Sequence, residues 1–183
     1  MSEPETLGTR LRSLRSARGC SLSELSRRSG IGKGTISELE NDRRGARLDT
    51  LFALTTALGA PLGALLPGTA ASAPTPDGEV RGDAVAAILL GRWDAGPQLV
   101  EVYRATVTAD EQHSAPHGPG VEETVTVVAG RVRVGARGAQ RELGAGESLR
   151  YRGDQPHHFT SLGPAAEVIL LMHYPRPADG GAP

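Results

Sequence analysis

Apolar residues recur along the chain with two different periods. Over residues 6–66 they return every three or four positions, as on the buried face of a helix. Over residues 79–175 they alternate with polar residues in short runs interrupted by Gly and Pro, which indicates strands. Residues 67–78, PGTAASAPTPDG, have no period and predict a linker. We expect residues 1–5 and 176–183 to be terminal tails, so the pattern predicts an all-α domain followed by an all-β domain.

The helical region divides into five short predicted helices. The first has one apolar face, formed by Leu7, Leu11 and Leu14. Its other face is expected to be exposed to solvent and carries Arg10, Arg12 and Arg15. The third helix is expected over Lys33 to Glu40, and the fourth ends at Gly59. Leu62 and Leu65 predict a short fifth helix, so the first domain is expected to be a five-helix bundle.

The second predicted helix begins and ends at strong local signals. Ser21 and Glu24 have the spacing of a capping box, in which the Ser hydroxyl caps the helix and the Glu side chain reaches back to the cap. Gly30 is suited to the left-handed conformation that ends a helix and lets the chain turn sharply. Two short helices joined by such a turn are typical of the helix-turn-helix arrangement, whose second helix enters the major groove.

The residues around this turn carry a family resemblance. The sequence SLSELSRRSGIGKGTISELEND, followed by LDTLFALTTALGAPLGALL, resembles the DNA-binding domain of the phage-repressor and xenobiotic-response-element (XRE) family. The resemblance implies that recognition-helix residues lie near the bases and that other residues hold the phosphates. The first set is Lys33, Gly34, Thr35, Ser37 and Glu38, and the second is Ser21, Asn41, Arg43 and Arg44.

The side-chain chemistry suits these roles. Lys33 can donate to guanine, Glu38 can accept from cytosine, and Ser37 can do either. Glu38 is an anion that would lie near phosphates, so a cytosine or a neighbouring Arg must offset its charge. Helix-turn-helix units also serve as protein-docking modules, which is the alternative interpretation of the pattern.

The net charge of −1 hides two domains of opposite sign. Residues 1–66 hold 10 basic and 7 acidic residues, whereas residues 67–183 hold 10 basic and 14 acidic residues. The first domain is therefore basic, as DNA binding requires. The single cysteine, Cys20, excludes a disulfide framework within the chain. The sequence lacks a signal-peptide pattern and any apolar run near the roughly 20 residues of a membrane span, so we expect a cytoplasmic protein, associated with the nucleoid when bound to DNA.

The second domain is predicted to be a small antiparallel barrel or jelly roll. About seven or eight short strands are expected in it, punctuated by Gly and Pro. They are predicted over residues 80–90, 99–108, 123–129, 131–135, 148–151, 158–161 and 167–173. A barrel of about this size has room for one small ligand.

Two segments of the second domain resemble the two motifs of the cupin family. They are HSAPHGPGVEETVTVVAGRVRV and LGAGESLRYRGDQPHHFTSLG. The resemblance implies a pocket or metal site formed by His117, Glu123 and His157. Ala115 stands where the family has its first His, so His113 is a substitute imidazole, and Glu122 competes with Glu123.

Two kinds of site remain open for these residues. Two imidazoles and one carboxylate suit iron(II) or another divalent ion such as Zn, Ni or Mn, with open positions for a further ligand. Alternatively, the same residues line a polar pocket that binds an organic effector without metal. His158 follows His157 along a strand and should point to the opposite face, which makes it a poor ligand.

The two resemblances together predict a regulator. We expect a homodimeric, sequence-specific DNA-binding transcriptional regulator, not an enzyme, whose cupin barrel binds a small-molecule effector or a metal ion. Double-stranded DNA is the expected partner, and no membrane association is expected. The alternative is a cupin-type mononuclear non-haem iron oxygenase or epoxidase with an N-terminal helical domain, since the sequence more loosely resembles an antibiotic-pathway epoxidase of the same domain order. A cupin isomerase with a vestigial helical domain is a third possibility.

Overall fold

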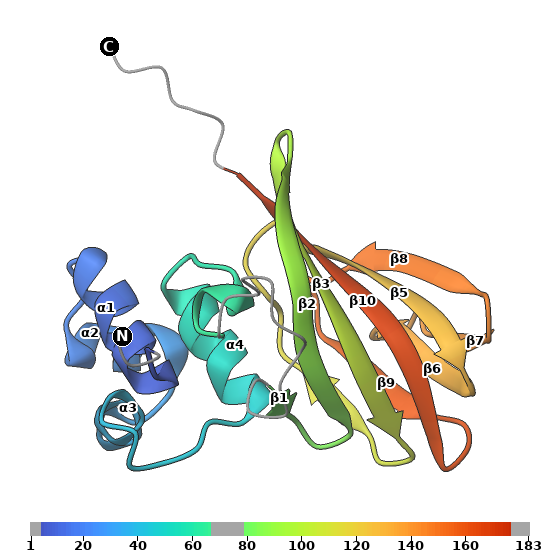
Figure 1. Ribbon diagram of the computed structural model, residues 1–183, viewed down its shortest axis with the longest axis horizontal. Coiled ribbons are helices and arrows are strands. Elements are labelled where there is room, and N and C mark those ends of the chain that lie inside the picture. Colours follow the sequence, from blue (N-terminus) through green and yellow to red (C-terminus); the bar gives the residue numbers. More distant parts are fainter. Residues whose placement is uncertain (1–4, 67–78, 177–183) are drawn as a thin grey trace. The chain divides into compact units, whose positions relative to one another are not determined.

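The computed structural model describes residues 5–66 and 79–176 (Figure 1). The chain divides into two compact units near residue 70. The predicted linker over residues 67–78 and most of both predicted tails lie outside the described residues. None of the described helices is long and apolar enough to cross a membrane.

The described part of the first unit, residues 5–66, contains four α-helices and one 3-10 turn. The elements are α1 (Leu7–Ala17), α2 (Leu22–Ser29), α3 (Lys33–Glu40), α4 (Leu48–Ala57) and the turn η1 (Leu62–Ala64). The apolar faces of the four helices meet in one core, in which Leu11, Leu25, Ile36, Leu51 and Leu54 are fully buried. The helical period read from the sequence therefore identified core residues on every helix, although Leu7 and Leu14 of α1 are only half-buried.

Local polar contacts define where the first helices begin and end. Thr6 and Ser21 occupy the caps of α1 and α2, and each side chain accepts a hydrogen bond from the backbone N–H three residues later, at 3.1 Å. These bonds satisfy N–H groups that have no partner within the helix. Gly30 ends α2 in the left-handed conformation, with φ of +73°, as the sequence predicted.

The prediction of a fifth helix is wrong. Leu62–Ala64 forms a single 3-10 turn, closed by a 3.0 Å hydrogen bond from Leu65 N–H to the Leu62 carbonyl. Gly59 ends the preceding helix with φ of +60°, and Pro61 caps the turn. The segment from Pro61 to Leu66 is too short to offset the free-energy cost of nucleating an α-helix. Leu62 and Leu65 are nevertheless buried, so the apolar pattern reported burial correctly and helix length incorrectly.

The described part of the second unit, residues 79–176, contains ten antiparallel strands in two sheets. The strands are β1 (Glu79–Arg81), β2 (Val85–Ala95), β3 (Gln98–Thr108), β4 (Gln112–Ser114), β5 (Glu122–Ala129), β6 (Arg131–Ala136), β7 (Arg141–Gly144), β8 (Ser148–Arg152), β9 (His157–Ser161) and β10 (Ala165–Pro175). The six-stranded sheet has the order β1-β2-β3-β10-β5-β8, and the four-stranded sheet has the order β4-β9-β6-β7. The two sheets face each other across the core (Figure 1).

The register of the six-stranded sheet brings one polar row into this core. Met172 of β10 lies opposite Glu101 of β3 and Glu123 of β5, and Glu123 lies opposite Tyr151 of β8. Residues paired in this way point to the same face of a sheet. Glu101, Met172 and Glu123 are all at most 1% exposed, so this row faces inward.

The strand predictions were correct in the middle of the strands and incomplete at the edges of the sheets. The segment predicted as one strand over residues 80–90 contains β1 and β2, separated by a tight turn in which Gly82 N–H donates to the Val85 carbonyl at 2.7 Å. The short strands β4 and β7 were not predicted, because three or four residues give too few alternations to recognise.

Candidate functional sites

Helices α2 and α3 are joined by a sharp turn whose geometry is fixed by short-range contacts. Gly30 supplies the left-handed residue. The Ser29 hydroxyl donates to the Leu25 carbonyl at 2.7 Å and accepts from Ile31 N–H at 3.2 Å. Ile31 leads directly into α3 through Gly32, which occupies its N-cap. The turn therefore places α3 as the second helix of a helix-turn-helix unit.

Helix α3 has one buried face and one accessible face. Ile36 and Leu39 are buried in the core of the unit. The predicted base-facing residues lie elsewhere on the helix: Lys33, Gly34 and Glu38 are exposed, and Thr35 and Ser37 are half-buried. The accessible positions therefore form one surface of the kind that a recognition helix presents to DNA.

The charge of Glu38 has a nearby compensation. Its carboxylate lies 3.6 Å from the guanidinium of Arg44, and both side chains are more than half exposed. Arg43, which precedes Arg44 in the loop after α3, is also exposed. Of the two expected compensations for Glu38, a cytosine or a neighbouring arginine, the arginine is thus present, and it comes from the loop predicted to contact phosphates.

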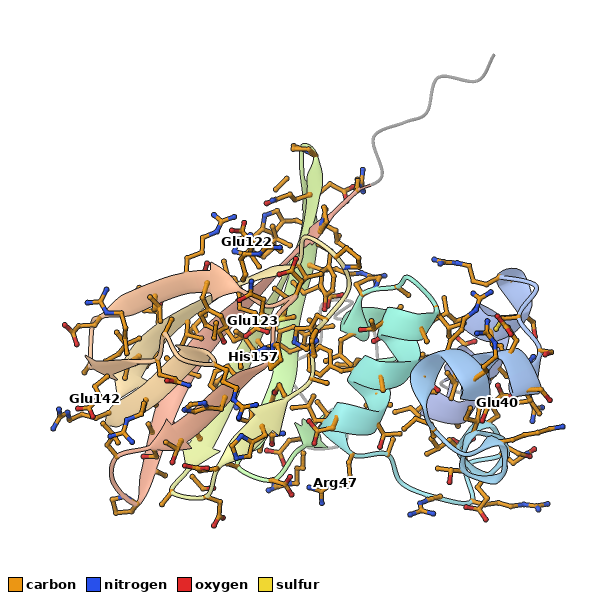
Figure 2. The ribbon with its side chains drawn as sticks, turned by 180° about the vertical axis from the view of Figure 1, so that it is seen from behind. Glu40, Arg47, Glu122, Glu123, Glu142 and His157 are labelled. Atoms are coloured by element: carbon orange, nitrogen blue, oxygen red, sulfur yellow. The ribbon has the colours of Figure 1, made fainter. Side chains whose placement is uncertain are left out.

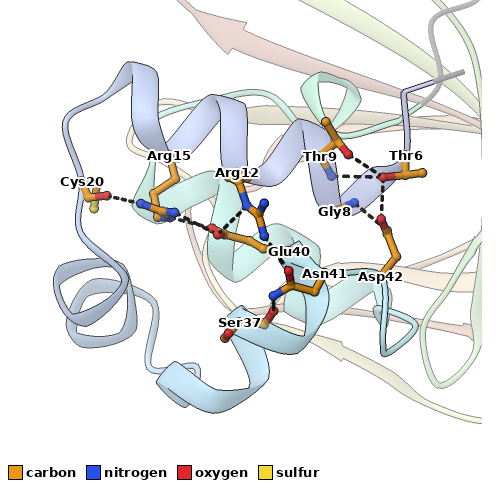
Figure 3. A network of polar contacts seen from close by, with 10 residues as sticks. All are labelled: Thr6, Gly8, Thr9, Arg12, Arg15, Cys20, Ser37, Glu40, Asn41 and Asp42. Atoms are coloured by element: carbon orange, nitrogen blue, oxygen red, sulfur yellow. Dashed lines mark hydrogen bonds and ion pairs between the residues drawn. The ribbon is translucent and has the colours of Figure 1, made fainter. Parts of the chain in front are cut away.

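A buried ion pair ties the end of α3 to α1 (Figure 3). Arg15 donates from Nε and Nη2 to the two carboxylate oxygens of Glu40, at 2.6 and 2.8 Å. Its Nη1 donates to the Cys20 carbonyl at 2.9 Å. The Glu40 side chain is 3% exposed and that of Arg15 is 15% exposed. The prediction that Arg15 belongs to a solvent face is therefore wrong, because this long-range partner draws it inward.

The polar network continues to the predicted phosphate-contacting residue Asn41 (Figure 3). Arg12 Nη2 donates to Asn41 Oδ1 at 2.7 Å, and Asn41 Nδ2 donates to the Ser37 carbonyl at 2.6 Å. Asp42, with φ of +51°, then accepts from the Thr6 hydroxyl and from Gly8 N–H at 2.6 and 3.0 Å. These bonds fix the position of α3 against α1. The residues that position the helix had no signal in the sequence, because their partners lie 25 or more positions away.

In the second unit, the structure brings together the three residues of the predicted cupin site, two of which Figure 2 labels. His117 Nε2 lies 2.8 Å from Glu123 Oε1, and His157 Nε2 lies 3.2 Å from the same oxygen. All three side chains are at most 4% exposed. One ligand atom from each lies within 4.8 Å of the others.

Three different elements position these side chains. His117 lies in the loop between β4 and β5, held by a 2.9 Å hydrogen bond from its N–H to the Gly153 carbonyl. Glu123 lies on β5, where it shares the inward face with Val125, and His157 is the first residue of β9. His157 Nδ1 lies 2.8 Å from the Gln155 carbonyl, so this nitrogen carries the proton. Its Nε2, 3.2 Å from Glu123 Oε1, donates to that oxygen when the ring is protonated and offers a lone pair to a metal when the ring is neutral.

Tyr151 is a further member of the site that the sequence analysis did not predict. Its hydroxyl donates to Glu123 Oε2, and its ring lies against the His157 ring, with 5.7 Å between ring centroids. Burial and the neighbouring Glu123 charge raise the pKa of Tyr151 well above its ordinary value, which keeps the phenol protonated and donating. The signal that could have found it is its alternation with Leu149 on β8, which turns both toward the core.

The ionisation of Glu123 reflects two opposing effects. Burial alone would raise its pKa, but the charge of His157 and the hydrogen bonds from His117 and His157 lower that pKa below its ordinary value. Burial would likewise lower the pKa of His157, and Glu123 raises it above its ordinary value. The carboxylate is thus held as an anion inside an apolar barrel, facing two imidazoles.

The structure places the two substitute ligands away from this site. His113 lies on β4 with its side chain 73% exposed, and its Nε2 lies 3.0 Å from Glu111. Glu122 points to the outer face of β5 and accepts from Arg150 Nη2 at 2.6 Å (Figure 2). Because successive residues of a strand face opposite sides, only one of Glu122 and Glu123 can face inward, and it is Glu123. His158 also points away from the interior, as predicted.

The donor set fits a divalent transition metal. Two imidazoles and one carboxylate that converge in a buried site form the combination that suits iron(II), zinc and related ions and leaves coordination positions open. His157 also has the backbone partner on its other ring nitrogen that orients a metal-bound imidazole.

Comparisons with known proteins agree with both units. Residues 6–67 match the helix-turn-helix domain family, and residues 103–174 match the cupin domain family. The HTH-type transcriptional regulator SutR of Escherichia coli (strain K12) is 28% identical over 174 residues, covering 93% of this chain and 96% of SutR. The crystal structure of an HTH_3 family transcriptional regulator from Vibrio cholerae matches with a TM-score of 0.79 and 26% identity, covering 94% of this chain and 97% of that one.

A weaker likeness connects the chain to an enzyme. The structure of hydroxypropylphosphonic acid epoxidase from S. wedmorenis matches with a TM-score of 0.38 and 21% identity, covering 92% of this chain and 97% of the epoxidase. A likeness at this level has no bearing on function.

The domain order, the helix-turn-helix geometry and the two regulator relatives define a DNA-binding transcriptional regulator. The chain carries a helix-turn-helix domain followed by a cupin domain, and over almost its whole length it is similar to these two transcriptional regulators.

Proposed function

We propose that this regulator reads operator DNA with the accessible surface of α3 and senses a ligand with the His117, Glu123 and His157 site of its barrel. The observation that carries the proposal is the pairing of an exposed recognition-helix surface with a convergent, buried donor set in the second unit. The first feature offers contacts to DNA bases. The second offers a site to which a small molecule or ion can bind selectively.

The DNA contacts follow from the exposed side chains and their charges. Lys33 and Ser37 contact base edges in the major groove, and Glu38 accepts from cytosine while Arg44 offsets its charge. Ser21, Arg43 and Arg44 hold phosphates on either side. Asn41 acts mainly through position, since its amide already bonds Arg12 and the Ser37 carbonyl.

The protein acts as a homodimer in this proposal. One helix-turn-helix unit reads only a few base pairs, and two units one DNA turn apart, about 34 Å, bind far more tightly than one. The net charge of −1 for the whole chain predicts modest non-specific affinity that falls steeply with salt. Specific binding therefore depends on dimerisation and on a few base contacts.

The barrel site holds the sensed ligand. His117, Glu123 and His157 would hold a divalent metal, and its open positions would supply Lewis-acid attachment for an oxygen or nitrogen atom of an organic effector. Tyr151 keeps Glu123 oriented through its hydrogen bond. The same donor set also favours a second candidate function, a mononuclear iron oxygenase, which the experiments below separate from the first.

The DNA half of the proposal is tested by footprinting and salt-titrated binding on DNA upstream of the protein's own gene. Lys33→Ala and Ser37→Ala should each weaken specific binding roughly tenfold or more and leave non-specific binding nearly unchanged. Arg104→Ala, which removes an exposed charge from β3 in the second unit, is the matched control and should bind normally. Specific binding that survives both α3 substitutions would overturn the assignment of the recognition helix.

The barrel half is tested by elemental analysis and metal titration of the purified protein. His117→Ala and His157→Ala should abolish stoichiometric metal, whereas the outward-facing His113→Ala should retain it. Equal metal content in all three variants would exclude this site. Stoichiometric iron in a protein without specific DNA binding would favour the oxygenase instead.

A further inference from the structure

The outer face of the four-stranded sheet carries a pocket that the regulatory function does not use. His113 of β4 and His158 of β9 are directly opposite each other in the register, and their ring centroids are 5.9 Å apart. Both rings line a cavity of about 430 Å³. Arg137 and Gln140, from the turn between β6 and β7, also line it. A cavity of this size admits a small organic molecule or a hydrated ion.

The pocket presents hydrogen-bond donors. Gln140 Nε2 lies 3.1 Å from His158 Nδ1, and an amide nitrogen can only donate. Neutral His158 therefore carries its proton on Nε2, which makes Nε2 a donor as well. The Arg137 guanidinium adds up to five donors and a permanent charge. Glu111 lies 3.0 Å from His113 Nε2 and is not among the residues that line the cavity.

We propose that this pocket binds an oxyanion, namely the carboxylate or phosphoryl group of a small molecule. A guanidinium and neutral N–H donors around a cavity suit an anion, and a guanidinium disfavours a metal cation. Among the residues that the structure describes, the group whose spacing could hold a metal is His117, Glu123 and His157, and neither His113 nor His158 belongs to it. The two outer imidazoles therefore serve an anion and not a second metal.

The pocket is separate from the site inside the barrel. His157 and His158 point to opposite faces of β9, so the inner ring faces Glu123 while the outer ring faces the pocket. His157 also contributes to the pocket lining, so the two sites share one wall. The inference goes beyond the proposed function, because anion binding here requires neither DNA nor a metal in the barrel.

The test measures anion binding to the full chain after metal removal and gel filtration into phosphate-free buffer. Inorganic phosphate and succinate are titrated separately by calorimetry, and side-chain NMR follows the rings of His113 and His158. The wild-type protein should show one saturable site for at least one anion, with shifts at both rings. Arg137→Gln should weaken the binding tenfold to a hundredfold, because it removes the charge-assisted bonds.

Two further variants keep the test decisive. Gln140→Leu removes the partner that orients His158 and should also weaken binding, by about tenfold. Arg104→Gln removes an exposed charge from the other sheet and should bind like the wild type. Binding of phosphate alone would identify a phosphoryl ligand, and binding of succinate alone a carboxylate. If neither anion binds, or if all the variants bind equally, the proposal is wrong.

Discussion

Glu40 of the helical unit and Glu123 of the barrel are both buried, and they differ in the side chains that face them. In the helical unit, Glu40 accepts two hydrogen bonds from the Arg15 guanidinium. In the barrel, Glu123 faces the imidazoles of His117 and His157. A guanidinium stays protonated in proteins and has no lone pair to offer, so the first pair is a permanent structural link. An imidazole can lose its proton and become a ligand, so the second cluster can exchange a proton for a metal.

The two buried glutamates also differ in where they lie relative to the candidate functional residues of their units. The Arg15–Glu40 pair is closed and holds α3 on its buried side, while the positions proposed to read DNA are on the accessible surface of the same helix. In the barrel the buried residues are themselves the candidate site. Mutation of the buried carboxylate should therefore affect stability in the first unit and ligand binding in the second.

The largest expected effect is the loss of the permanent pair. Arg15→Leu leaves Glu40 buried without its main partner, which should destabilise the helical unit by about 3–5 kcal/mol. The double variant Arg15→Leu/Glu40→Leu removes both charges and should recover much of that loss. Far-UV circular dichroism during urea unfolding measures both. A double variant as unstable as the single one would show that the pair is not what positions α3.

The next effect belongs to the exchangeable site. Zn²⁺ at about 100 times its dissociation constant should stabilise the barrel by about 2.7 kcal/mol and leave the helical unit unchanged. Hydrogen exchange followed by mass spectrometry resolves the two, since β5 and β9 should gain protection while α1 and α3 should not. His117→Ala should abolish the gain and His113→Ala should keep it. Equal protection of both units would show that the exchangeable metal site is not confined to the barrel.

A smaller effect concerns the space around Glu123. A Cβ added at Gly153 would lie 3.1 Å from Glu123 Oε1 and 3.2 Å from His117 Cδ2. Both neighbours are buried and cannot withdraw freely, so Gly153→Ala should displace the donors and weaken metal affinity by about tenfold. Gly163→Ala, where no heavy atom lies within 4 Å of the new carbon, is the control and should bind metal normally. Calorimetric metal titration gives both affinities, and equal values would show that the site adapts.

Local signals explain how much of this structure the sequence could predict. The cap at Ser21, the left-handed Gly30 and the range of α3 depend on residues that are close in the sequence, and each was predicted correctly. The other half of the predicted capping box is wrong, because the Glu24 side chain accepts from Arg27 and Arg28 and does not reach back to the cap. The convergence of His117 and His157 depended on family motifs. The competition between Glu122 and Glu123 could have been resolved by parity, because Glu123 alternates with the buried valines of β5.

Long-range pairings explain what the sequence could not predict. The pattern of an amphipathic helix places Arg15 on the surface, because the sequence does not reveal that Glu40, 25 positions later, lies beside it. His113 is close to His117 in the sequence and was therefore a candidate ligand, but the pairing of β4 with β9 turns its side chain outward. A period along the chain identifies a face of an element, but it does not identify what that face meets.

The smallest expected effect comes from an ion cluster on the surface, in which Glu24 faces two arginines. It differs from the buried Glu40 and Glu123 clusters in its contact with water. Hydrogen bonds from Arg27 and Arg28 lower the pKa of Glu24 to about 2. Because the folded pKa is depressed, the stabilisation is present above the ordinary pKa of about 4.3 and is lost as the pH falls toward 2. Water and salt screen exposed pairs, so Glu24→Gln should hardly change the thermal midpoint at pH 7. An NMR titration should show the Glu24 pKa rising toward its ordinary value in 1 M salt, where the screening length is about 3 Å. A pKa that stays low in 1 M salt would mean that this surface pair behaves like the buried Arg15–Glu40 pair.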